Sequence, residues 1–513
     1  ELKKLVPNKG VGLDDISPRF LKDGADSLTF IISHLVNLSI TTKTVPDCIK
    51  VAKVTPLHKK NSKLDVGNYR PVSVLSSVSK ILEKAVHAQL ETYCNQHRIL
   101  YQLQSGFRGN YSTSTCLMYL HDCIRTEISN GNVVGMIMID VQKAFDCVDH
   151  QQLCEKIRLA GIDPSWFQSY LCNRNQTVFV NGFPSNREQI KAGVPQGSIL
   201  GPWFYLLFSN DLPSCVKDHK CTIILYADDT IMLTSHKDTK TVAEVLSSAL
   251  DSCYHWFTNN NLVMHSGKTE CMLITSRRKK HLQKDFVIKH AGQEIKPSDC
   301  VKYLGLKIDS TLSGELIVDS ILSKCNARLK FLYRYKNILN FKTKKLLVSA
   351  LIQSHFDYAS TAWFFSLNKG LQKQLQVAQN KMVRYILDLG NRAHIGQNEL
   401  DRVNMLTVAD RATQLMLNHM FNIHNRTAPS YLCNQFKILT YAYNTRRSSQ
   451  NNLITKTTHG IANANFHAIG SKEWNKLPDA IKTMDSKDNY KKEVKRFLKA
   501  QSHLKEANMF LYY

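Results

Sequence analysis

The chain has 513 residues, of which 43% are hydrophobic and 21% charged, enough for several domains with apolar cores. Lys and Arg outnumber Asp and Glu by 67 to 42, and the net charge of +25 favours a nucleic-acid partner over a merely well-solvated basic surface. Fourteen cysteines without a C-x-x-C pair argue against a zinc ribbon or a disulfide framework, and no apolar run is long enough to cross a bilayer. We expect free thiols in a reducing compartment and, since the sequence does not begin with Met, a piece of a longer protein.

The first half of the chain alternates between helical and strand-like patterns. After a Gly-Asn turn and an X-Pro bond, apolar residues recur at helical spacing in "VSKILEKAVHAQLETYC" (78–94). The β-rich run "VVGMIMIDV" (133–141) is typical of a buried strand, and "TVFVNGFPS" (177–185) carries an Asn-Gly turn signal. Residues 222–227 and 230–234 predict a hairpin with Asp228 and Asp229 at its tip, and 241–257 predicts an amphipathic helix.

The strand-like segments "ECMLIT" (270–275) and "VKYLGLKI" (301–308) continue this alternation to about residue 309. The pattern predicts an α+β fold with helices on one face of a sheet. Beyond 310 the spacing is helical, with helices expected at about 344–365 and 371–387. In "ILSKCNARLKFLYRYK" (321–336), Lys324 with Arg328 and Lys330 with Arg334 form basic i,i+4 pairs, and the apolar face runs through Ile321, Cys325, Leu329 and Leu332.

Three carboxylates stand at strand ends. Asp140 ends the strand at 133–141, and Asp228 and Asp229 occupy the hairpin tip. Placed together they would repel one another and raise one another's pKa values, and burial without partners would cost several kcal/mol each. A divalent cation removes this cost, and two Mg²⁺ ions with substrate phosphates would carry out nucleotidyl transfer. The alternative is ordinary turn and helix-cap aspartates, which we prefer for Asp146 and Asp149.

Seven ordered motifs resemble those of reverse transcriptases. "IDVQKAFDCVDH", "AGVPQGSILGPWFYLLFSNDLP" and "LYADDTIM" resemble the three central palm motifs, and "NNNLVMHSGKTECMLI" and "VKYLGLKID" resemble the next two. "NYRPVSVLSSVSKILEKAV" and "QSGFRGNYSTSTCL" are similar to the fingers motifs of non-LTR (LINE-like) retrotransposons of the jockey/CR1-like branch. The match covers about residues 37–309 and extends more loosely through "LIQSHFDYASTAWF" to "SKEWNKLPDAI".

The resemblance implies a right-hand polymerase with fingers, a palm made of an antiparallel sheet with helices on one face, and a helical thumb. We expect an N-terminal extension at 1–36, fingers and palm at 37–309 and a thumb at 310–400, followed by a C-terminal region of unknown role at 401–513.

Roles for the carboxylates follow from the same resemblance. Asp140 and Asp228 would bind two Mg²⁺ ions, which Mn²⁺ could replace, with the backbone carbonyl of Val141 in one shell and Asp229 as a weaker, supporting carboxylate. Lys268 resembles the lysine proposed to protonate leaving pyrophosphate, and a solvated surface lysine is the alternative. The thumb cations expected to grip a duplex backbone are Lys324, Arg328, Lys330 and Arg334, with an ordinary basic helix face as an equal alternative.

The resemblance also implies a nucleotide site. Phe145 occupies the position of a steric gate, whose ring would clash with a 2′-OH, and plain core packing is the alternative. Gly197 lies where the backbone approaches the template base and the nucleotide, and Gln196 would donate near the sugar or phosphate. Arg70 resembles the fingers arginine that holds the triphosphate, and Lys63 is its expected companion. Lys59 and Lys60 compete with Lys63 for that role.

Together these motifs imply an RNA-directed DNA polymerase that extends a DNA primer with deoxynucleoside triphosphates on an RNA template. The expected localisation is the nucleus, with a cytoplasmic ribonucleoprotein stage and no membrane partner. The main alternative is a catalytically silent or domesticated nucleic-acid-binding protein on the same fold, against which the intact carboxylates, Phe145 and Gly197 argue. A two-metal nuclease is a third possibility, which the order of the motifs disfavours.

Overall fold

The computed structural model describes residues 1–59, 61–438, 452–455 and 457–510. The chain folds into two compact units, the first made of residues 1–107, 138–231 and 248–269, the second of 108–137, 232–247 and 270–513. It passes between them within strands β3 (Val133–Ile139) and β9 (Asp229–His236) and within helix α8 (Thr239–Asn259). Over the described ranges, no helix is both long enough and apolar enough to span a membrane.

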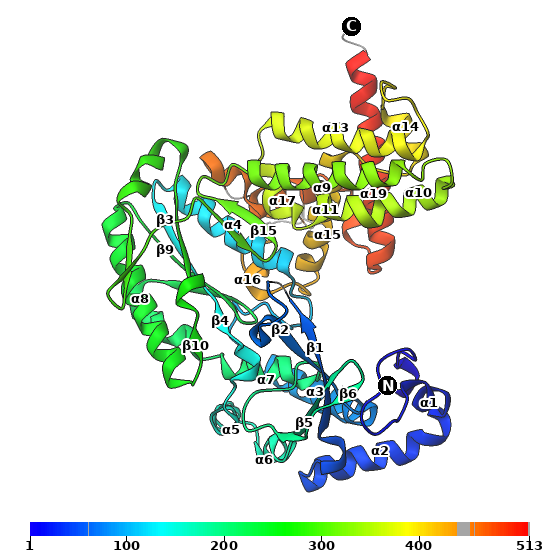
Figure 1. Ribbon diagram of the computed structural model, residues 1–513. Helices are drawn as coiled ribbons and strands as arrows, with labels where there is room; N and C mark the ends of the chain where they lie inside the picture. The colour runs from blue at the N-terminus through cyan, green and yellow to red at the C-terminus, as the bar shows by residue number, and fades with distance from the viewer. Residues whose placement is uncertain (60, 439–451, 456, 511–513) are drawn as a thin grey trace, which may run out of the picture. The chain divides into compact units, whose positions relative to one another are not determined.

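The first unit contains a sheet of the order β2-β1-β5-β6, with β7 also paired to β5 (Figure 1). Its strands are β1 (Val51–His58), β2 (Tyr69–Val74), β5 (Asn175–Val180), β6 (Phe183–Pro184) and β7 (Glu188–Gln189). β1 pairs antiparallel with β2 and parallel with β5. The predicted Asn-Gly turn joins β5 to β6, and Asn181 and Gly182 adopt the left-handed φ values of 52° and 90° that such a turn requires.

The helices of the first unit include a hydrogen-bonded contact between a fingers motif and a palm motif. They are α1 (Pro18–Asp23), α2 (Ala25–Thr42), α3 (Ser77–Gln96), α5 (His150–Leu159), α6 (Ser165–Leu171) and α7 (Leu200–Phe208). α3 confirms the helix predicted at 78–94. Its fully buried Glu83 accepts hydrogen bonds from the backbone N–H groups of Ile199 at 2.6 Å and Leu200 at 3.3 Å, at the start of α7. Asp149 caps α5 as predicted, because it accepts the N–H of Gln152 at 2.8 Å.

A four-stranded sheet has the order β11-β3-β9-β8, with β8 (Thr222–Tyr226) and β11 (Glu270–Ile274) at its edges. The remaining strands form three short antiparallel pairs: β4 (Val141–Gln142) with β10 (Val263–Met264), β12 (Ile288–His290) with β13 (Gln293–Ile295), and β14 (Cys300–Tyr303) with β15 (Leu306–Asp309). The strands predicted at 133–141, 222–234 and 270–275 and the helix at 241–257 are confirmed within one or two residues. The single strand predicted at 301–308 is wrong, because Leu304 and Gly305 adopt left-handed φ values of 44° and 82° and turn the chain back into the hairpin β14–β15.

The second unit is mostly helical. Its helices are α4 (Thr113–Ser129), α9 (Glu315–Tyr333), α10 (Phe341–Val348), α11 (Ser354–Asp357), α12 (Ser360–Trp363), α13 (Lys369–Ile386), α14 (Gln397–Arg402), α15 (Val408–His424), α16 (Ser430–Cys433), α17 (Phe466–Asn475), α18 (Asp479–Lys482) and α19 (Lys487–Phe510). α9, α10 and α13 lie alongside one another in the green-to-yellow part of Figure 1. α9 buries the predicted apolar face through Ile321, Cys325, Leu329 and Leu332.

The single helix predicted at 344–365 is wrong, because its α-helical geometry is interrupted twice, first by a change of helix type and then by a break. α10 passes into a π-helical stretch at Ser349–Gln353, and the chain leaves helical geometry at Tyr358, where ψ is 114°, and at Ala359, where φ is 50°. Tertiary hydrogen bonds explain the second break. The hydroxyl of Tyr358 donates to the Leu304 carbonyl, and Trp363 Nε1 donates to the Tyr358 carbonyl at 3.1 Å. Side-chain bonds of this kind override the local helical pattern.

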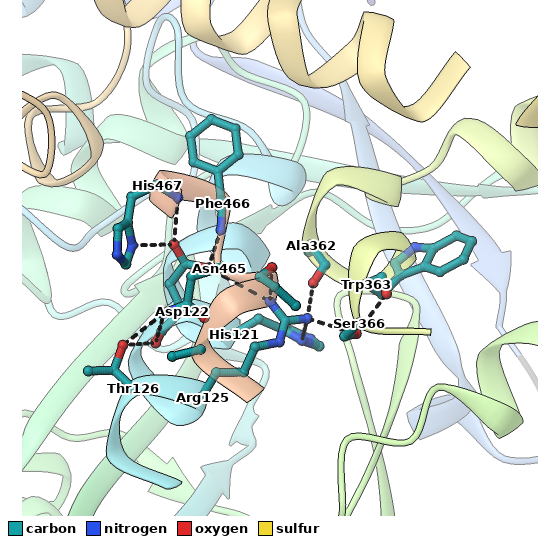
Figure 2. A network of polar contacts seen from close by, with 12 residues as sticks. His121, Asp122, Arg125, Thr126, Ala362, Trp363, Ser366, Asn465, Phe466 and His467 are labelled. Carbon is teal, nitrogen blue, oxygen red and sulfur yellow. Dashed lines mark hydrogen bonds and ion pairs between the residues drawn. The ribbon is translucent and has the colours of Figure 1, made fainter. Parts of the chain in front are cut away.

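α4 anchors the C-terminal segment of the second unit (Figure 2). The buried Asp122 carboxylate accepts the backbone N–H groups of Phe466 at 2.8 Å and His467 at 3.3 Å, so it caps α17 from another helix. His467 Nδ1 lies 3.2 Å from the same carboxylate, and Asn465 donates to the Thr126 hydroxyl at 2.9 Å. Residues 465–467, within the region whose role the sequence left open, are thus bonded to the helix that begins within the second fingers motif.

Arg125, one turn along α4, reaches toward the thumb motif "LIQSHFDYASTAWF" (Figure 2). Its buried guanidinium donates to the carbonyl of Ala362 and to the Ser366 hydroxyl, the latter at 3.1 Å. It also donates to the Ala464 carbonyl at 3.4 Å. α4 therefore joins the segment around α12 and the segment before α17 into one packed body.

Candidate active site

The three carboxylates singled out in the sequence lie within electrostatic range of one another. Asp140 directly follows β3, and Asp228 lies in the turn between β8 and β9. Burial, and then the charge of Asp140, raises the pKa of Asp228. Partial withdrawal from water, followed by the charges of Asp228 and Asp140, raises the pKa of Asp229 to about 6. A common cation is the simplest way to relieve this repulsion.

Lys268 forms an ion pair with Asp140. Its Nζ donates to Asp140 Oδ2 at 3.0 Å, and both side chains are about half exposed. The backbone N–H of His265 donates to the Asp140 carbonyl at 2.9 Å, and Met264 pairs with the buried Val141 between β10 and β4. The segment that carries Lys268 is therefore held against the segment that carries Asp140.

The turn before Asp228 depends on a residue that the sequence analysis did not identify. Ala227 has a left-handed φ of 58°, and both its N–H and its carbonyl are hydrogen-bonded to the side chain of Gln104. The only sequence signal was the "QSG" of the second fingers motif, whose periodicity says nothing about such a contact.

The "VPQGS" loop is fixed between the palm and the fingers hairpin. Gln196 Nε2 donates to Asp146 Oδ1 at 2.8 Å, and the Gln196 carbonyl accepts the N–H of Ser73 on β2 at 2.7 Å. Gly197 has a φ of 126°, and a Cβ there would lie 2.4 Å from the Ser73 carbonyl oxygen. The close approach that requires glycine in this structure is therefore to β2.

The fingers hairpin β1–β2 presents cations to the carboxylates. Arg70 lies opposite Leu57 in the β1–β2 register and is exposed, and its charge and that of Lys59 lower the pKa of Asp228, opposing the effect of burial. Lys63 is exposed in the connecting loop, where its carbonyl accepts the Tyr69 hydroxyl at 2.9 Å. Lys60 lies outside the described residues.

Phe145 is half-buried between two other rings. Its ring centroid lies 4.9 Å from that of the buried Tyr205 and 6.1 Å from that of Phe107, edge-to-face. Its carbonyl accepts the N–H of Val194 at 2.8 Å. The contact with Tyr205 is a packing contact, and part of the Phe145 ring stays accessible.

The predicted thumb cations divide into two groups on α9 and at its end. Three are exposed, namely Lys324, Lys330 and Arg334. The guanidinium of Arg328 instead contacts the Leu351 carbonyl and His355 within the second unit. Part of the hydrogen-bonding capacity of Arg328 is therefore used within the protein.

Residues 57–308 match the family described as reverse transcriptase (RNA-dependent DNA polymerase). This chain carries a reverse transcriptase domain. The probable RNA-directed DNA polymerase from transposon BS of Drosophila melanogaster is 27% identical over 398 residues, or 75% of this chain and 44% of that protein. The RNA-directed DNA polymerase from the mobile element jockey of the same organism is 27% identical over 397 residues, or 75% and 43% of the two chains.

These relatives confirm the resemblance to the jockey-like branch, and the reverse transcriptase domain confirms the right-hand polymerase fold. The chain spans less than half of the length of these relatives. Among solved structures, apo telomerase from Candida tropicalis aligns over 71% of this chain and 68% of its own, at 12% identity and a TM-score of 0.38. A superposition this loose says nothing about function.

The reverse transcriptase family implies a general requirement for divalent metal ions. The donors at this site are carboxylate oxygens, which suit hard cations such as Mg²⁺. Across the described ranges, no group of three or more His, Cys, Asp or Glu side chains is arranged to hold a metal ion by itself.

Proposed function

We propose that this chain is the RNA-directed DNA polymerase of a non-LTR retrotransposon and extends a primer 3′-OH on an RNA template. The supporting observation is the proximity of Asp140, Asp228 and Asp229, with Arg70 and Lys59 close enough to lower the pKa of Asp228. Carboxylates can bind the metal counter-ions of a triphosphate, and a fingers cation beside them can bind its phosphate oxygens. The names of the BS and jockey relatives agree with this activity.

In this proposal Asp140 and Asp228 hold two Mg²⁺ ions, with Mn²⁺ as a substitute, the Val141 carbonyl as a further ligand and Asp229 in support. When bound, the ions would activate the primer 3′-OH and stabilise the leaving oxygen.

The chain's own residues hold the reactants and manage charge. The O3′–Pα bond forms as the bond between Pα and the leaving pyrophosphate breaks, and the proton of the 3′-OH passes to solvent. Arg70 and Lys63 would bind the triphosphate, which suits their position on the exposed fingers hairpin. Phe145 would lie under the sugar. Gln196, whose Nε2 donates one hydrogen bond to Asp146, would contact the sugar or phosphate through its remaining hydrogen-bonding groups. Lys268 Nζ lies 3.0 Å from Asp140 Oδ2, and Lys268 would donate a proton to pyrophosphate.

The nucleic-acid partners in this proposal are an RNA template and a DNA primer. The exposed cations of α9 would hold the duplex backbone without reading its sequence. We also propose that the protein acts in the nucleus after a cytoplasmic ribonucleoprotein stage. Immunofluorescence of the tagged chain tests that placement.

The proposed activity is tested by primer extension on poly(rA)/oligo(dT) with Mg²⁺ and dTTP. The wild-type protein should extend the primer and Asp228→Ala should abolish extension. Asp218→Ala is the matched control, because Asp218 is an exposed aspartate of the same unit and should be dispensable. Equal extension by wild type and Asp228→Ala would refute the site. Binding of the template-primer without extension by any variant would instead favour the nucleic-acid-binding alternative.

A further inference from the structure

The turn that presents Asp228 is held by a segment from the second fingers motif. The N–H of Leu225, at the end of β8, donates to the Leu103 carbonyl at 3.1 Å, and the N–H of Ser105 donates to the Leu225 carbonyl at 2.8 Å. Gln104 and Leu225 form a parallel bridge. Residues 103–105 thus extend alongside β8 where the strand enters the catalytic turn.

The carboxamide of Gln104 bonds to both backbone polar groups of Ala227. Its Oε1 accepts the Ala227 N–H at 2.9 Å and its Nε2 donates to the Ala227 carbonyl at 3.2 Å. The same Oε1 accepts the Gly106 N–H at 2.8 Å. Gln104 is 2% exposed, so water does not compete readily for these bonds.

Ala227 needs such support because its backbone is left-handed. A φ of 58° is unfavourable for a residue with a Cβ, and alanine has no side-chain hydrogen bond to offset it. Gly106 makes the approach possible, since a Cβ at that position would lie 2.3 Å from the Ala227 nitrogen. Ala227 immediately precedes Asp228, so its dihedral angles set the direction in which the catalytic carboxylate leaves the strand.

We propose that Gln104 is a positioning residue for nucleotidyl transfer, which holds Ala227 in its left-handed conformation and thereby places Asp228. This inference rests on the proposed polymerase activity. Gln104 touches no reacting atom in this account. It acts only through the geometry of the turn.

The first test is the kinetics of Gln104→Ala. A displacement of Asp228 by about 1 Å should lower kcat for primer extension by about 100-fold and leave the KM for template-primer nearly unchanged. The matched control is Gln379→Ala on α13, which removes another buried glutamine bonded to a backbone carbonyl, and should destabilise the fold without lowering kcat. Adding Ala227→Gly to Gln104→Ala should recover at least tenfold in kcat, because glycine adopts a left-handed φ without support.

The second test is Gln104→Glu, which keeps the shape of the side chain. The ionised carboxylate can still accept the two N–H groups but faces the Ala227 carbonyl without a hydrogen to donate. Protonation restores that donor, so the ratio of variant to wild-type kcat should rise as pH falls from 8.5 to 6. Hydrogen exchange supplies a readout besides activity: the Ala227 amide should exchange at least tenfold faster in Gln104→Ala than in wild type.

Two results would overturn the inference while leaving the polymerase assignment intact. One is wild-type kcat in folded Gln104→Ala. The other is a ratio of Gln104→Glu kcat to wild-type kcat that does not change with pH. This second measurement can be made even if the alanine variant fails to fold. Absence of extension by the wild-type protein would instead count against the proposed function itself.

Discussion

Gly197→Ala tests the contact between the "VPQGS" loop and the fingers hairpin. The new Cβ would lie 2.4 Å from the Ser73 carbonyl oxygen, whereas ordinary contacts begin at 3.4 Å, so loop and β2 must separate by about 1 Å. That shift stretches the 2.7 Å hydrogen bond from Ser73 N–H to the Gln196 carbonyl, worth about 1 kcal/mol. The φ of 126° adds a backbone penalty of about 1–3 kcal/mol.

The free energy of unfolding should therefore fall by about 2–4 kcal/mol, measured by urea denaturation. The rate of primer extension on poly(rA)/oligo(dT) should fall by about 100-fold, because the loop that carries Gln196 moves by about 1 Å.

Gly182→Ala is the matched control. Gly182 has a φ of 90° in the β5–β6 turn, but nothing lies within 4 Å of a Cβ placed there. Its alanine variant carries only the backbone penalty, about 1–2 kcal/mol, and should extend primers at the wild-type rate. Equal destabilisation by the two substitutions, together with wild-type extension by Gly197→Ala, would show that the approach to β2 does not matter.

Three further predictions concern charge, sugar selection and the C-terminal segment. The folded-state pKa of Asp229, about 6, exceeds that of an unfolded aspartate, so without divalent ions the free energy of unfolding should fall as pH rises from about 4 to about 6. Asp229→Asn should remove this part of the pH dependence of the free energy of unfolding, measured by urea denaturation with EDTA. An unchanged pH dependence in that variant would contradict the prediction. Phe145→Ala should increase ribonucleotide incorporation relative to deoxynucleotide incorporation in single-nucleotide extension, and unchanged selectivity would remove the gate. Asp122→Asn should lower the free energy of unfolding by about 1–3 kcal/mol, because it weakens the cap of α17. The exposed Asp488→Asn serves as its control, and equal stability of the two variants would show that the cap is unimportant.

The sequence was sufficient for features that depend on local pattern. Strand runs around Asp140 and Asp228, the Asn-Gly turn and the apolar face of α9 follow from periodicities of two and 3.6, and these elements are where they were predicted. Because strand ends gather at one edge of a sheet, the same patterns also predict that the carboxylates lie close together.

Features that depend on distant contacts could not be predicted. Asp122 is one of two acidic residues in an amphipathic helix, and the N–H groups that it accepts lie more than 340 residues further along the chain. The break at Tyr358 arises from a bond to Leu304, and Arg328 turns toward His355 although its spacing fits an exposed stripe. None of these contacts leaves a trace in local spacing.

The central claim, that Asp140 and Asp228 share a divalent-ion site, is tested most directly by Fe²⁺-dependent cleavage of the protein backbone. Fe²⁺ with ascorbate generates hydroxyl radicals at a bound ion, and mass spectrometry locates the cuts. We predict cuts near both residue 140 and residue 228, suppressed by excess Mg²⁺ and lost together in Asp228→Ala. Cuts near only one of these residues, or cuts that persist in that variant, would contradict the account.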